Sequence, residues 1–584
     1  MEAKKAVRDQ IISNHDIAEK FRLLADLLEI KGEASYKIAA YRKAADSIDH
    51  TPEPLSTLRQ QGKLETIPGV GKAIAQKIED LLDTGTFELL EEVTSEYPPT
   101  LRELLQVPDL GPKRVKLLWG ELKVGSLDAL ELAIEDGRIY KVKGLGPKAI
   151  ERIIEGLKSL KGRDIRIPIG KARELGKRIV QQLLEKTDKV EKIELAGSIR
   201  RFRETAGDID IVAASEHPED IIDTFCSLPM VQDVNMKGEN RCRVMIEGGI
   251  QVDLICLPAQ HWGTLLLHFT GSRDHNLHLR DLALERGAHM SEYGFKKNEQ
   301  LITFSTEEEV YKFLGIQYVP PEMREDRGEI ELSLIHQLPK VIRQKDIRGD
   351  LHMHSTWSDG KCSIRDMALA ARSLGYEYIC ITDHSQSLGI ARGLTPERIV
   401  EQRKEIESLN KELAPFKILQ GIEMEVLSDG SMDLPEEVLR DLDLVIASVH
   451  SGLRQGREKV TSRALAAIRH PLVDILAHPT GRIIGSREGG DFDLETIFRE
   501  AARTGTILEV DGDPNRLDLR DVNAQEAVDS GCLISISSDA HSIEGLYNME
   551  YGVGTAARGW IRPQDVINTR PLDEMLKLLK RNRS

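Results

Sequence analysis

Three aspartates in the middle of the chain have the spacing of a metal site. Asp208 and Asp210 lie in the alternating run 207–212, GDIDIV, where a strand's period of two puts both carboxylates on one face and the isoleucines on the other. A second run, 250–255, exposes Asp253 among apolar residues, and we expect it to form a neighbouring strand. Three converging carboxylates would hold two hard divalent ions, which in-line phosphoryl or nucleotidyl transfer requires.

The residues before these acids have the chemistry of an anion site. Gly197 and Ser198 follow a short apolar strand predicted at 193–196, and Arg200 and Arg201 come next. A turn with N–H groups, a hydroxyl and guanidinium charge close to metal-binding acids suits a triphosphate. A strand edge with solvated charges would explain an isolated DxD pair, but the combined spacing of the motifs disfavours that interpretation.

With these motifs the sequence resembles the nucleotidyltransferase superfamily, and specifically the family X DNA polymerases of the DNA polymerase beta type. The HFTGS segment at 268–272 and the YVPPEMRE segment at 318–325 extend the resemblance, with His268 in place of the commoner tyrosine. The resemblance implies that Asp208, Asp210 and Asp253 are catalytic metal ligands and that Arg280 touches the template minor groove. The positions that it implies for nucleotide binding are Arg166, Ser198, Arg201, Gly207, Phe269, Gly271 and Asn276.

Three N-terminal segments, 67–78, 107–115 and 142–150, repeat one pattern. Each places glycine in a tight turn before a helix that carries lysine in its first turn, so N–H groups and a cation can meet a backbone phosphate. An ordinary helix cap explains one such turn, but three copies with the same apolar spacing favour helix-hairpin-helix DNA binding; Asp109 stands where the second copy would usually have glycine. The expected DNA contacts are Gly69, Gly71, Lys72, Lys113, Gly144, Gly146 and Lys148.

The resemblance also implies a candidate lyase site near the N-terminus. Lys37, Tyr41 and Lys77 align with positions of the beta-type small domain that bind a 5'-phosphate and form a Schiff base with an abasic sugar. An amine nucleophile must be deprotonated, which neighbouring cations would promote. Ala73 replaces one family lysine, and the alternative is that Lys77 is a phosphate contact or a solvated helix residue.

Metal-binding residue types return after position 349. His352 and His354 share a strand face and Asp359 follows in a loop, which gives nitrogen and oxygen ligands for a transition metal. Later apolar segments also end in such residues, as expected where alternating strands and helices gather ligands at the mouth of a barrel. One strand-end histidine would more often be structural, but an ordered series of nine is not explained in that way. The nine are His352, His354, Asp359, His384, Glu423, His450, His478, Asp539 and His541.

This half of the chain resembles the polymerase and histidinol phosphatase (PHP) domain, a seven-stranded distorted barrel whose trinuclear centre hydrolyses phosphoesters. The resemblance implies up to three ions, Mn²⁺ or Zn²⁺, in the barrel, beside two Mg²⁺ or Mn²⁺ ions at the polymerase aspartates. Glu425 shares a strand face with Glu423, so either could be the ligand there. Arg516 is a candidate contact for the scissile phosphate, with a surface salt bridge as the alternative.

Length and composition set further bounds. A chain of 584 residues should comprise several domains, and a formal net charge of −16 argues against attraction of DNA by the whole surface. No apolar run approaches the roughly 20 residues that span a bilayer, and the N-terminus lacks the apolar core of a signal peptide. The six cysteines show no CxxC pairing and are expected to be buried thiols in a reducing compartment, so we expect a cytoplasmic protein.

We therefore expect a multidomain α+β and α/β chain. The predicted parts are a helical N-terminal domain with one hairpin (1–90), fingers with two more (91–165), a nucleotidyltransferase palm (166–260), an α/β thumb (261–335), a linker (336–349) and a distorted (β/α)7 PHP barrel (350–584).

The expected function is a monomeric DNA-directed DNA polymerase that fills short gaps in base excision repair, with gapped or nicked DNA and dNTPs as substrates. The barrel would add a metal-dependent 3'-5' exonuclease, with cleavage at abasic sites and removal of blocked 3' groups as further candidate reactions. Two alternatives stay open: the barrel is a small-molecule phosphatase, or the whole chain is a non-enzymatic DNA-end binder.

Overall fold

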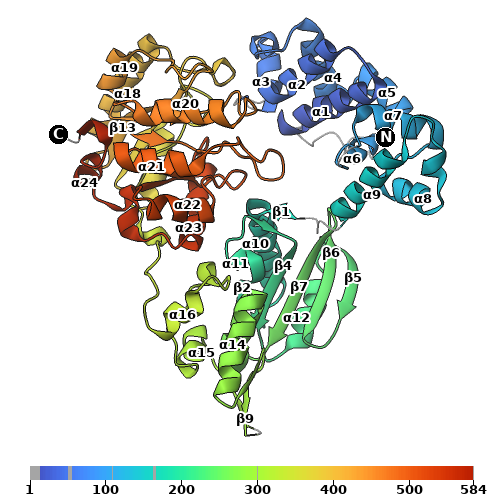
Figure 1. Ribbon diagram of the computed structural model, residues 1–584, viewed down its shortest axis with the longest axis vertical. Coiled ribbons are helices and arrows are strands. Elements are labelled where there is room, and N and C mark those ends of the chain that lie inside the picture. Colours follow the sequence, from blue (N-terminus) through green and yellow to red (C-terminus); the bar gives the residue numbers. More distant parts are fainter. Residues whose placement is uncertain are drawn as a thin grey trace. The chain divides into compact units, whose positions relative to one another are not determined.

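The computed structural model describes residues 14–49, 51, 55–107, 110–161, 166–298 and 300–582. By internal contacts the chain divides into two units, Met1–Asp164 with Gly389–Ala391, and Ile165–Leu388 with Arg392–Ser584. Mixed helical and sheet architecture with a parallel barrel in the C-terminal half confirms the predicted fold class (Figure 1). None of the described helices combines the length and the apolar character needed to cross a membrane.

The first unit is helical over its described residues. Its helices are α1 (Asn14–Lys31), α2 (Ser35–Asp49), α3 (Leu55–Gln60), α4 (Lys72–Thr84), α5 (Glu88–Glu96), α6 (Leu101–Leu104), α7 (Pro112–Leu122), α8 (Leu127–Glu135) and α9 (Pro147–Lys161). A continuous apolar core joins them, and in it Phe21 stacks on both Tyr41 and Phe87. Aromatic contacts of this kind add to the burial energy of the helix faces that they connect.

A five-stranded sheet forms the palm at the start of the second unit. Its order is β2 (Lys192–Leu195), β4 (Asp208–Ala214), β7 (Ile250–Leu257), β6 (Arg241–Ile246) and β5 (Val231–Lys237), with β4 and β7 parallel and the other pairs antiparallel. The palm also contains β1 (Ile167–Pro168), β3 (Thr205–Ala206), α10 (Ile169–Lys186), α11 (Gly197–Arg200) and α12 (Pro218–Cys226).

The two faces of β4 have different partners. Ile209 and Ile211 belong to the apolar core that includes residues of α10 and α12, so those helices cover one face of the sheet. Val212 belongs instead to the small cluster that includes Leu265 of the thumb helix α13. Because side chains alternate along a strand, the predicted acids Asp208 and Asp210 lie on this second face, away from α10 and α12.

The thumb follows the palm and combines helices with a small antiparallel sheet. Its elements are α13 (Trp262–Thr270), α14 (Arg273–Glu285), β8 (His289–Ser291), β9 (Gly294–Lys297), β10 (Gln300–Ile302), α15 (Glu307–Phe313), the short 3-10 helix η4 (Pro321–Met323) and α16 (Glu329–Leu334). Inside it Glu307 accepts from Arg200 Nη1 and Nη2 (2.9 and 2.8 Å) and from the fully buried Arg324 (2.5 Å). Paired in this way, a buried carboxylate is stabilised in its charged form, and the pKa of Glu307 falls to about 2 although burial alone would raise it.

Seven parallel strands in chain order form the C-terminal barrel. They are β11 (Gly349–Asp350), β12 (Tyr378–Ile381), β13 (Lys417–Glu425), β14 (Leu444–Ser448), β15 (Ile475–Leu476), β16 (Ile507–Asp511) and β17 (Ile534–Ser537). The segments that follow the first and last strands meet where His354 N donates to Ala540 O (2.8 Å), which nearly closes the barrel. Nearly every strand residue is buried, as expected for a parallel sheet that is covered on both sides.

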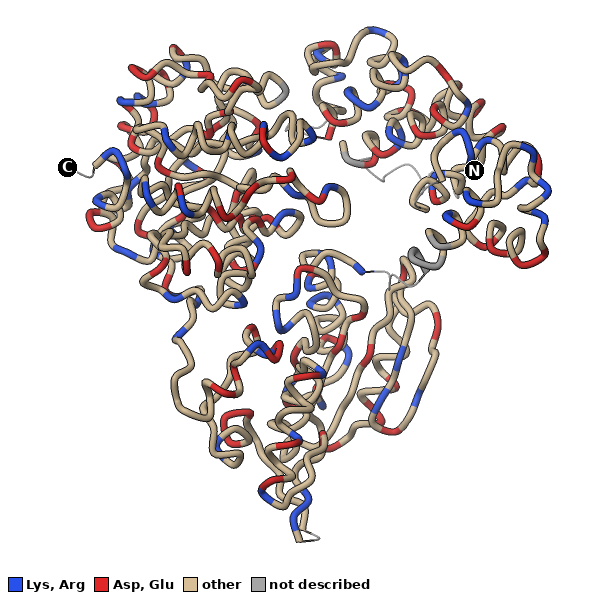
Figure 2. Tube along the Cα trace, in the orientation of Figure 1, with Lys and Arg blue, Asp and Glu red and all other residues tan. Residues whose placement is uncertain are grey.

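Helices surround these strands. They are α17 (Ile364–Ser373), α18 (Pro396–Glu412), α19 (Glu436–Asp441), α20 (Arg457–Arg469), α21 (Leu494–Thr504), α22 (Asp521–Asp529), α23 (Met549–Arg558) and α24 (Leu572–Leu576). Figure 2 shows acidic and basic residues interspersed along the chain rather than separated into blocks.

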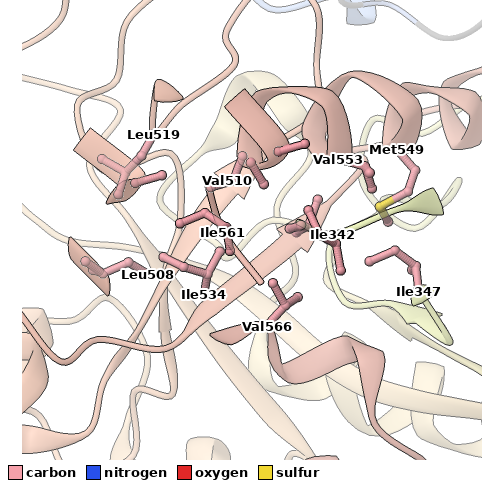
Figure 3. Packing of buried hydrophobic residues seen from close by; sticks show 14 of the residues in the cluster. Ile342, Ile347, Leu508, Val510, Leu519, Ile534, Met549, Val553, Ile561 and Val566 are labelled. Atoms are coloured by element: carbon pink, nitrogen blue, oxygen red, sulfur yellow. The ribbon is translucent and has the colours of Figure 1, made fainter. Parts of the chain in front are cut away.

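The segment 336–349, predicted as a linker, packs against the barrel. Ile342 and Ile347 lie among apolar side chains of the barrel strands and of α23, including Val510 and Val553 (Figure 3). Ile342 N also donates to Ile561 O (2.8 Å). One apolar core therefore runs from the thumb through this segment into the barrel.

Two candidate metal centres and the candidate DNA-binding hairpins

The register of two parallel palm strands brings the three predicted aspartates together. Asp210 of β4 lies directly beside Asp253 of β7, and Asp208 lies beside Gln251. Burial, followed by the charges of Asp208 and Asp253, raises the pKa of Asp210 to about 7. This carboxyl is therefore partly protonated near neutral pH, and a cation beside it would favour the ionised form.

Asp253 is held by an arginine that we did not predict. Arg243 lies opposite Asp253 on the antiparallel strand β6, and its Nε and Nη2 donate to the two carboxylate oxygens (2.7 and 2.8 Å). Arg241 Nη2 lies 3.5 Å from the same group. The alternating RCRVMI sequence of β6 was the available signal, but only strand register shows which acid its arginines meet. A cation at Asp253 must compete with this bidentate pair.

Gly197 allows the anion-binding turn to approach the aspartates. It has φ +56°, and a Cβ added there would overlap the carboxylate of Asp210. A residue with a side chain would therefore displace Asp210 or the turn. Ser198 follows in the short helix α11, and Gly207 immediately precedes β4.

Arg201, the predicted triphosphate ligand, is engaged by the rest of the protein. Its Nε donates to Glu325 (3.0 Å), and its Nη1 donates to the carbonyl oxygen of Thr270. Gly271, with φ +72°, leaves room for the Arg201 guanidinium beside the HFTGS turn. Arg166, by contrast, is exposed and donates to the hydroxyl and the carbonyl of Thr205 (2.8 and 2.6 Å).

The remaining predicted nucleotide and template residues lie on α13 and α14. Asn276 is buried and its Nδ2 donates to the carbonyl of His268 (2.7 Å), so it fixes the helix end that carries Phe269. The Nε of Arg280 is also buried, and among the described residues it has no hydrogen-bond partner. Asn276 thus anchors the first turn of α14 to the HFTGS segment.

All nine predicted metal ligands of the barrel gather at the C-terminal ends of its strands. Eight of them form three groups whose ligand atoms lie within 4.8 Å of one another: His354, Asp359, His384 and His541; His352, His354 and Asp539; and His384, Glu423 and His450. The ninth, His478, has Nε2 at 2.9 Å from Glu423. His478 and Asp539 have φ of 26° and 49°, which non-glycine residues rarely adopt away from functional sites.

Unpaired buried nitrogens show that this donor set fits metal ions. Nε2 of His352 and Nδ1 of His354 and His478 are buried, and within the described residues they have no hydrogen-bond partner. Leaving such atoms unpaired is costly unless something binds them. Imidazole nitrogens mixed with carboxylate oxygens suit Zn²⁺ or Mn²⁺.

Burial and neighbouring charges in the barrel centre shift the pKa values of two of its histidines in opposite directions. Burial lowers the pKa of His352, but Glu509, Asp539 and Glu423 together outweigh it and hold that pKa well above its usual value. Burial, followed by the charges of His541 and His384, lowers the pKa of His354 to about 3. His354 is therefore neutral at pH 7, the state in which imidazole binds a metal.

Two further carboxylates orient the ligands. Glu509 of β16, the strand without a predicted ligand, lies 2.8 Å from His352 Nδ1 and accepts from His478 N (2.8 Å). Glu425 lies 2.7 Å from His450 Nδ1, so it supports a ligand while Glu423 faces the ligand groups. Carboxylates behind metal-binding histidines fix their tautomer and orientation. We did not predict a role for Glu509. The available signal was an acidic residue inside a buried, mostly apolar strand.

The three predicted hairpins share the hydrogen bond that closes the turn. One backbone hydrogen bond closes each turn: Val70 N donates to Ile67 O (3.0 Å), Leu110 N to Val107 O (3.0 Å) and Leu145 N to Val142 O (3.3 Å). The next glycine then precedes α4, α7 or α9, and Lys72, Lys113 and Lys148 are exposed in the first turns. Gly69 and Gly144 have φ of +83° and +98°, which the turn needs. Asp109 lies outside the described residues.

Comparisons with known proteins agree with this architecture. Residues 265–325 match the DNA polymerase beta thumb, 12–87 a helix-hairpin-helix domain, 101–159 a SAM-like helix-hairpin-helix tandem, and 350–503 the PHP domain. The DNA polymerase/3'-5' exonuclease PolX of Bacillus subtilis (strain 168) is 38% identical over 571 residues, which cover 97% of this chain and 99% of that protein. The chain belongs to the PolX family. Polymerase and PHP domains of this family are metal-dependent.

More distant relatives match smaller shares of the chain. DNA polymerase lambda of Rattus norvegicus is 25% identical over 344 residues, 53% of this chain and 56% of that protein. A probable phosphatase of Thermoanaerobacter sp. (strain X514) is 28% identical over 245 residues, 40% of this chain and 95% of that protein. The PolX chain thus has relatives among both polymerases and phosphatases.

Two predicted sites remain expectations in this PolX chain. Arg516 has Nε at 3.9 Å from Asp539 and 3.7 Å from Asp511, so it lies at the edge of the barrel centre and also pairs with acids. In the candidate lyase site, Lys77 Nζ donates to the carbonyl of Ala73 (3.1 Å) and Lys37 Nζ lies 3.4 Å from Glu33.

Proposed function

We propose that the two activities of the PolX family reside in two separate centres of this chain, DNA synthesis in the palm and 3'-5' digestion in the barrel. The observation that carries the proposal is that two complete ligand sets are built on different sheets, one of carboxylates and one of mixed imidazoles and carboxylates. The first set suits Mg²⁺ or Mn²⁺, and the second suits Mn²⁺ or Zn²⁺.

In the palm, Asp208 and Asp210 would hold both ions, and Asp253 would complete the site beside the primer 3'-hydroxyl. Bound ions would neutralise the phosphates and acidify that hydroxyl. Ser198 and Arg201 would bind the leaving phosphates, while the turn at Phe269 and Gly271 would face the nucleotide sugar. Asp210 would give up its proton when the site is loaded, because its pKa is about 7 in the free protein.

In the barrel, the nine predicted ligands would hold up to three ions, which would activate water and stabilise charge on the scissile phosphate. Glu509 and Glu425 would keep His352 and His450 in the orientation that binds metal. Arg516 would contact the phosphate of a bound 3' end. Abasic-site cleavage and removal of blocked 3' groups would use the same phosphodiester chemistry.

The exposed lysines of the three hairpins would bind the DNA backbone around a gap. Such contacts ignore base sequence, which suits a repair enzyme that meets gaps in any context. We propose that the protein acts as a monomer in base excision repair in the cytoplasm, with domains at 1–90, 91–165, 166–260, 261–335 and 350–584.

Paired assays on three proteins test this assignment. Wild type, Asp210→Ala and His354→Ala are each given a gapped duplex with one dNTP, and separately a 3'-labelled single strand with Mn²⁺. We expect Asp210→Ala to lose roughly a thousandfold in extension and keep digestion, and His354→Ala to do the reverse.

Other outcomes would reject the assignment. If digestion falls in Asp210→Ala and survives in His354→Ala, the activities have been placed in the wrong centres. If wild type hydrolyses a histidinol-phosphate-like ester but leaves DNA intact, the barrel is a small-molecule phosphatase. If neither assay shows turnover although the gapped duplex binds, the chain is a non-enzymatic binder.

A further inference from the structure

The last residue of the barrel helix α23 reaches the palm's candidate triphosphate site. Arg558, at the end of α23, is buried, and its Nη1 donates to the backbone carbonyl of Arg201 (2.8 Å) and to Glu325 Oε1 (2.8 Å). Its Nη2 lies 3.1 Å from Asp521 of the barrel. The side chain therefore joins the barrel, the thumb segment and the anion-binding motif of the palm.

Glu325 is shared by three guanidinium groups. Arg201 Nε and Arg558 Nη1 both donate to Oε1 (3.0 and 2.8 Å), while Arg203 Nη1 donates to Oε2 (3.1 Å). The side chains of Arg201 and Glu325 are 12% and 10% exposed, so water screens this cluster poorly. With Asp521 beside Arg558, two carboxylates lie against these three guanidinium groups, so the cluster keeps a net positive charge next to the candidate triphosphate site.

Close packing fixes the position of Arg558 relative to the palm. Gly554, one turn earlier in α23, lies against Phe202, and a Cβ at Gly554 would overlap the Phe202 ring. Phe202 follows Arg201 in sequence and has φ +53°, and the Arg173 guanidinium covers its ring at 4.5 Å from the centroid. Arg327 Nη2 also donates to the carbonyl of Arg558 (2.5 Å). The barrel helix thus supports the turn that carries Arg201.

We propose that Arg558 is a positioning residue of the nucleotide site, supplied by the barrel domain. It holds the backbone of Arg201 in place and competes with Arg201 for Glu325. When a triphosphate arrives, Arg558 and Arg203 keep Glu325 paired while Arg201 turns to the phosphates. This inference rests on the proposed role of Arg201.

Steady-state gap filling by the full chain tests the inference. In Arg558→Ala, Glu325 would hold Arg201 more tightly, so we expect KM for the dNTP to rise about tenfold with kcat within about twofold and 3'-5' digestion unchanged. Arg558→Lys keeps the charge but loses the paired guanidinium donors, so we expect KM for the dNTP to rise about threefold. The matched control is Lys177→Ala, which removes another ion pair between palm and barrel, Lys177 with Glu550 (3.0 Å), and should leave KM unchanged.

A second variant separates positioning from folding. If Glu325 restrains Arg201 in the absence of Arg558, then adding Glu325→Gln to Arg558→Ala should return KM to within about threefold of wild type. Unchanged KM in Arg558→Ala overturns the inference while the proposed function stands. A parallel loss of kcat, digestion and melting temperature with unchanged KM also overturns it, because that pattern marks a folding defect. Absence of extension by wild type overturns both the inference and the proposed function.

Discussion

The barrel centre and the palm centre each gather several carboxylates, and different groups offset the repulsion between these charges in each centre. In the barrel, imidazoles lie against the carboxylates and offset their charge, as where Glu423 lies 2.8 Å from His384 and 2.9 Å from His478. In the palm, carboxylates stand beside carboxylates, and the protein compensates with a proton on Asp210 and with Arg243 on Asp253. The two centres therefore differ in what balances their carboxylates, imidazoles in the barrel and a raised pKa together with an arginine in the palm.

The largest expected effect concerns the carboxylate at the middle of the barrel centre. Glu423→Gln removes the charge that His352, His384, His450 and His478 share, so we expect digestion to fall by about a thousandfold and bound metal to be lost on desalting, with gap filling unchanged. Elemental analysis of the purified protein and the 3'-labelled strand assay measure this. Retained metal and normal digestion would contradict it.

Glu425→Gln is the matched control for that variant. The carboxylate lies on the same strand but behind His450, so its loss should have a smaller effect than the loss of Glu423. Equal effects of the two substitutions would remove the distinction between ligand and supporting group.

A weaker effect is expected behind the barrel ligands. Glu509→Gln weakens the acceptor at His352 Nδ1, so metal affinity should fall by about 10- to 100-fold. Competition with a chelator of known affinity measures this change. The Mg²⁺ requirement of gap filling should not change in Glu509→Gln. An altered requirement would show that the two centres are not independent.

Mg²⁺ binding at the palm centre should depend on pH through Asp210. Because the pKa of Asp210 is about 7, a cation must displace a proton below that pH, and the apparent Mg²⁺ affinity should fall by roughly tenfold for each unit below neutrality. Above pH 7 the carboxyl is already ionised, so the dependence should disappear. Mg²⁺ titrations of single-nucleotide insertion between pH 5.5 and pH 8.5 test the sign; a flat profile would mean that Asp210 is ionised throughout.

The smallest expected effect concerns the arginine that covers Asp253. Arg243→Ala frees both carboxylate oxygens, so half-saturation with Mg²⁺ should occur at about fivefold lower concentration. Arg241→Ala, whose guanidinium lies 3.5 Å from the same acid, should shift it less. A higher Mg²⁺ requirement in Arg243→Ala would show instead that the arginine orients Asp253 for the ion.

Much of this arrangement could be predicted from the sequence because it depends on local periodicity. Asp208 and Asp210 share a face in any strand, and the barrel ligands follow apolar runs, so topology alone gathers them. The polymerase resemblance, the fold class and the two activities are confirmed by the match to PolX. Individual site roles, domain limits and the lyase residues remain predictions.

What the sequence could not reveal depends on register and on long-range packing. Arg243 meets Asp253 only because β6 and β7 pair with one particular offset. Arg558 meets Arg201 across more than three hundred residues of chain, with α23 packed on Phe202 as the intermediary. Short motifs contain no information about such partners, and a basic residue at a helix end is usually solvated.

The packing of residues 341–347 determines where the chain can be divided. A fragment that starts at the first histidine motif would lack Val341, Ile342 and Ile347, which belong to the apolar core of the barrel. Ile342 and Ile347 lie among side chains of α23 and the barrel strands (Figure 3). Truncation there would open an apolar gap and remove the bond from Ile342 N to Ile561 O, favouring aggregation over a clean excision. Recombinant barrel fragments should therefore begin upstream of Leu338, which also packs against this core.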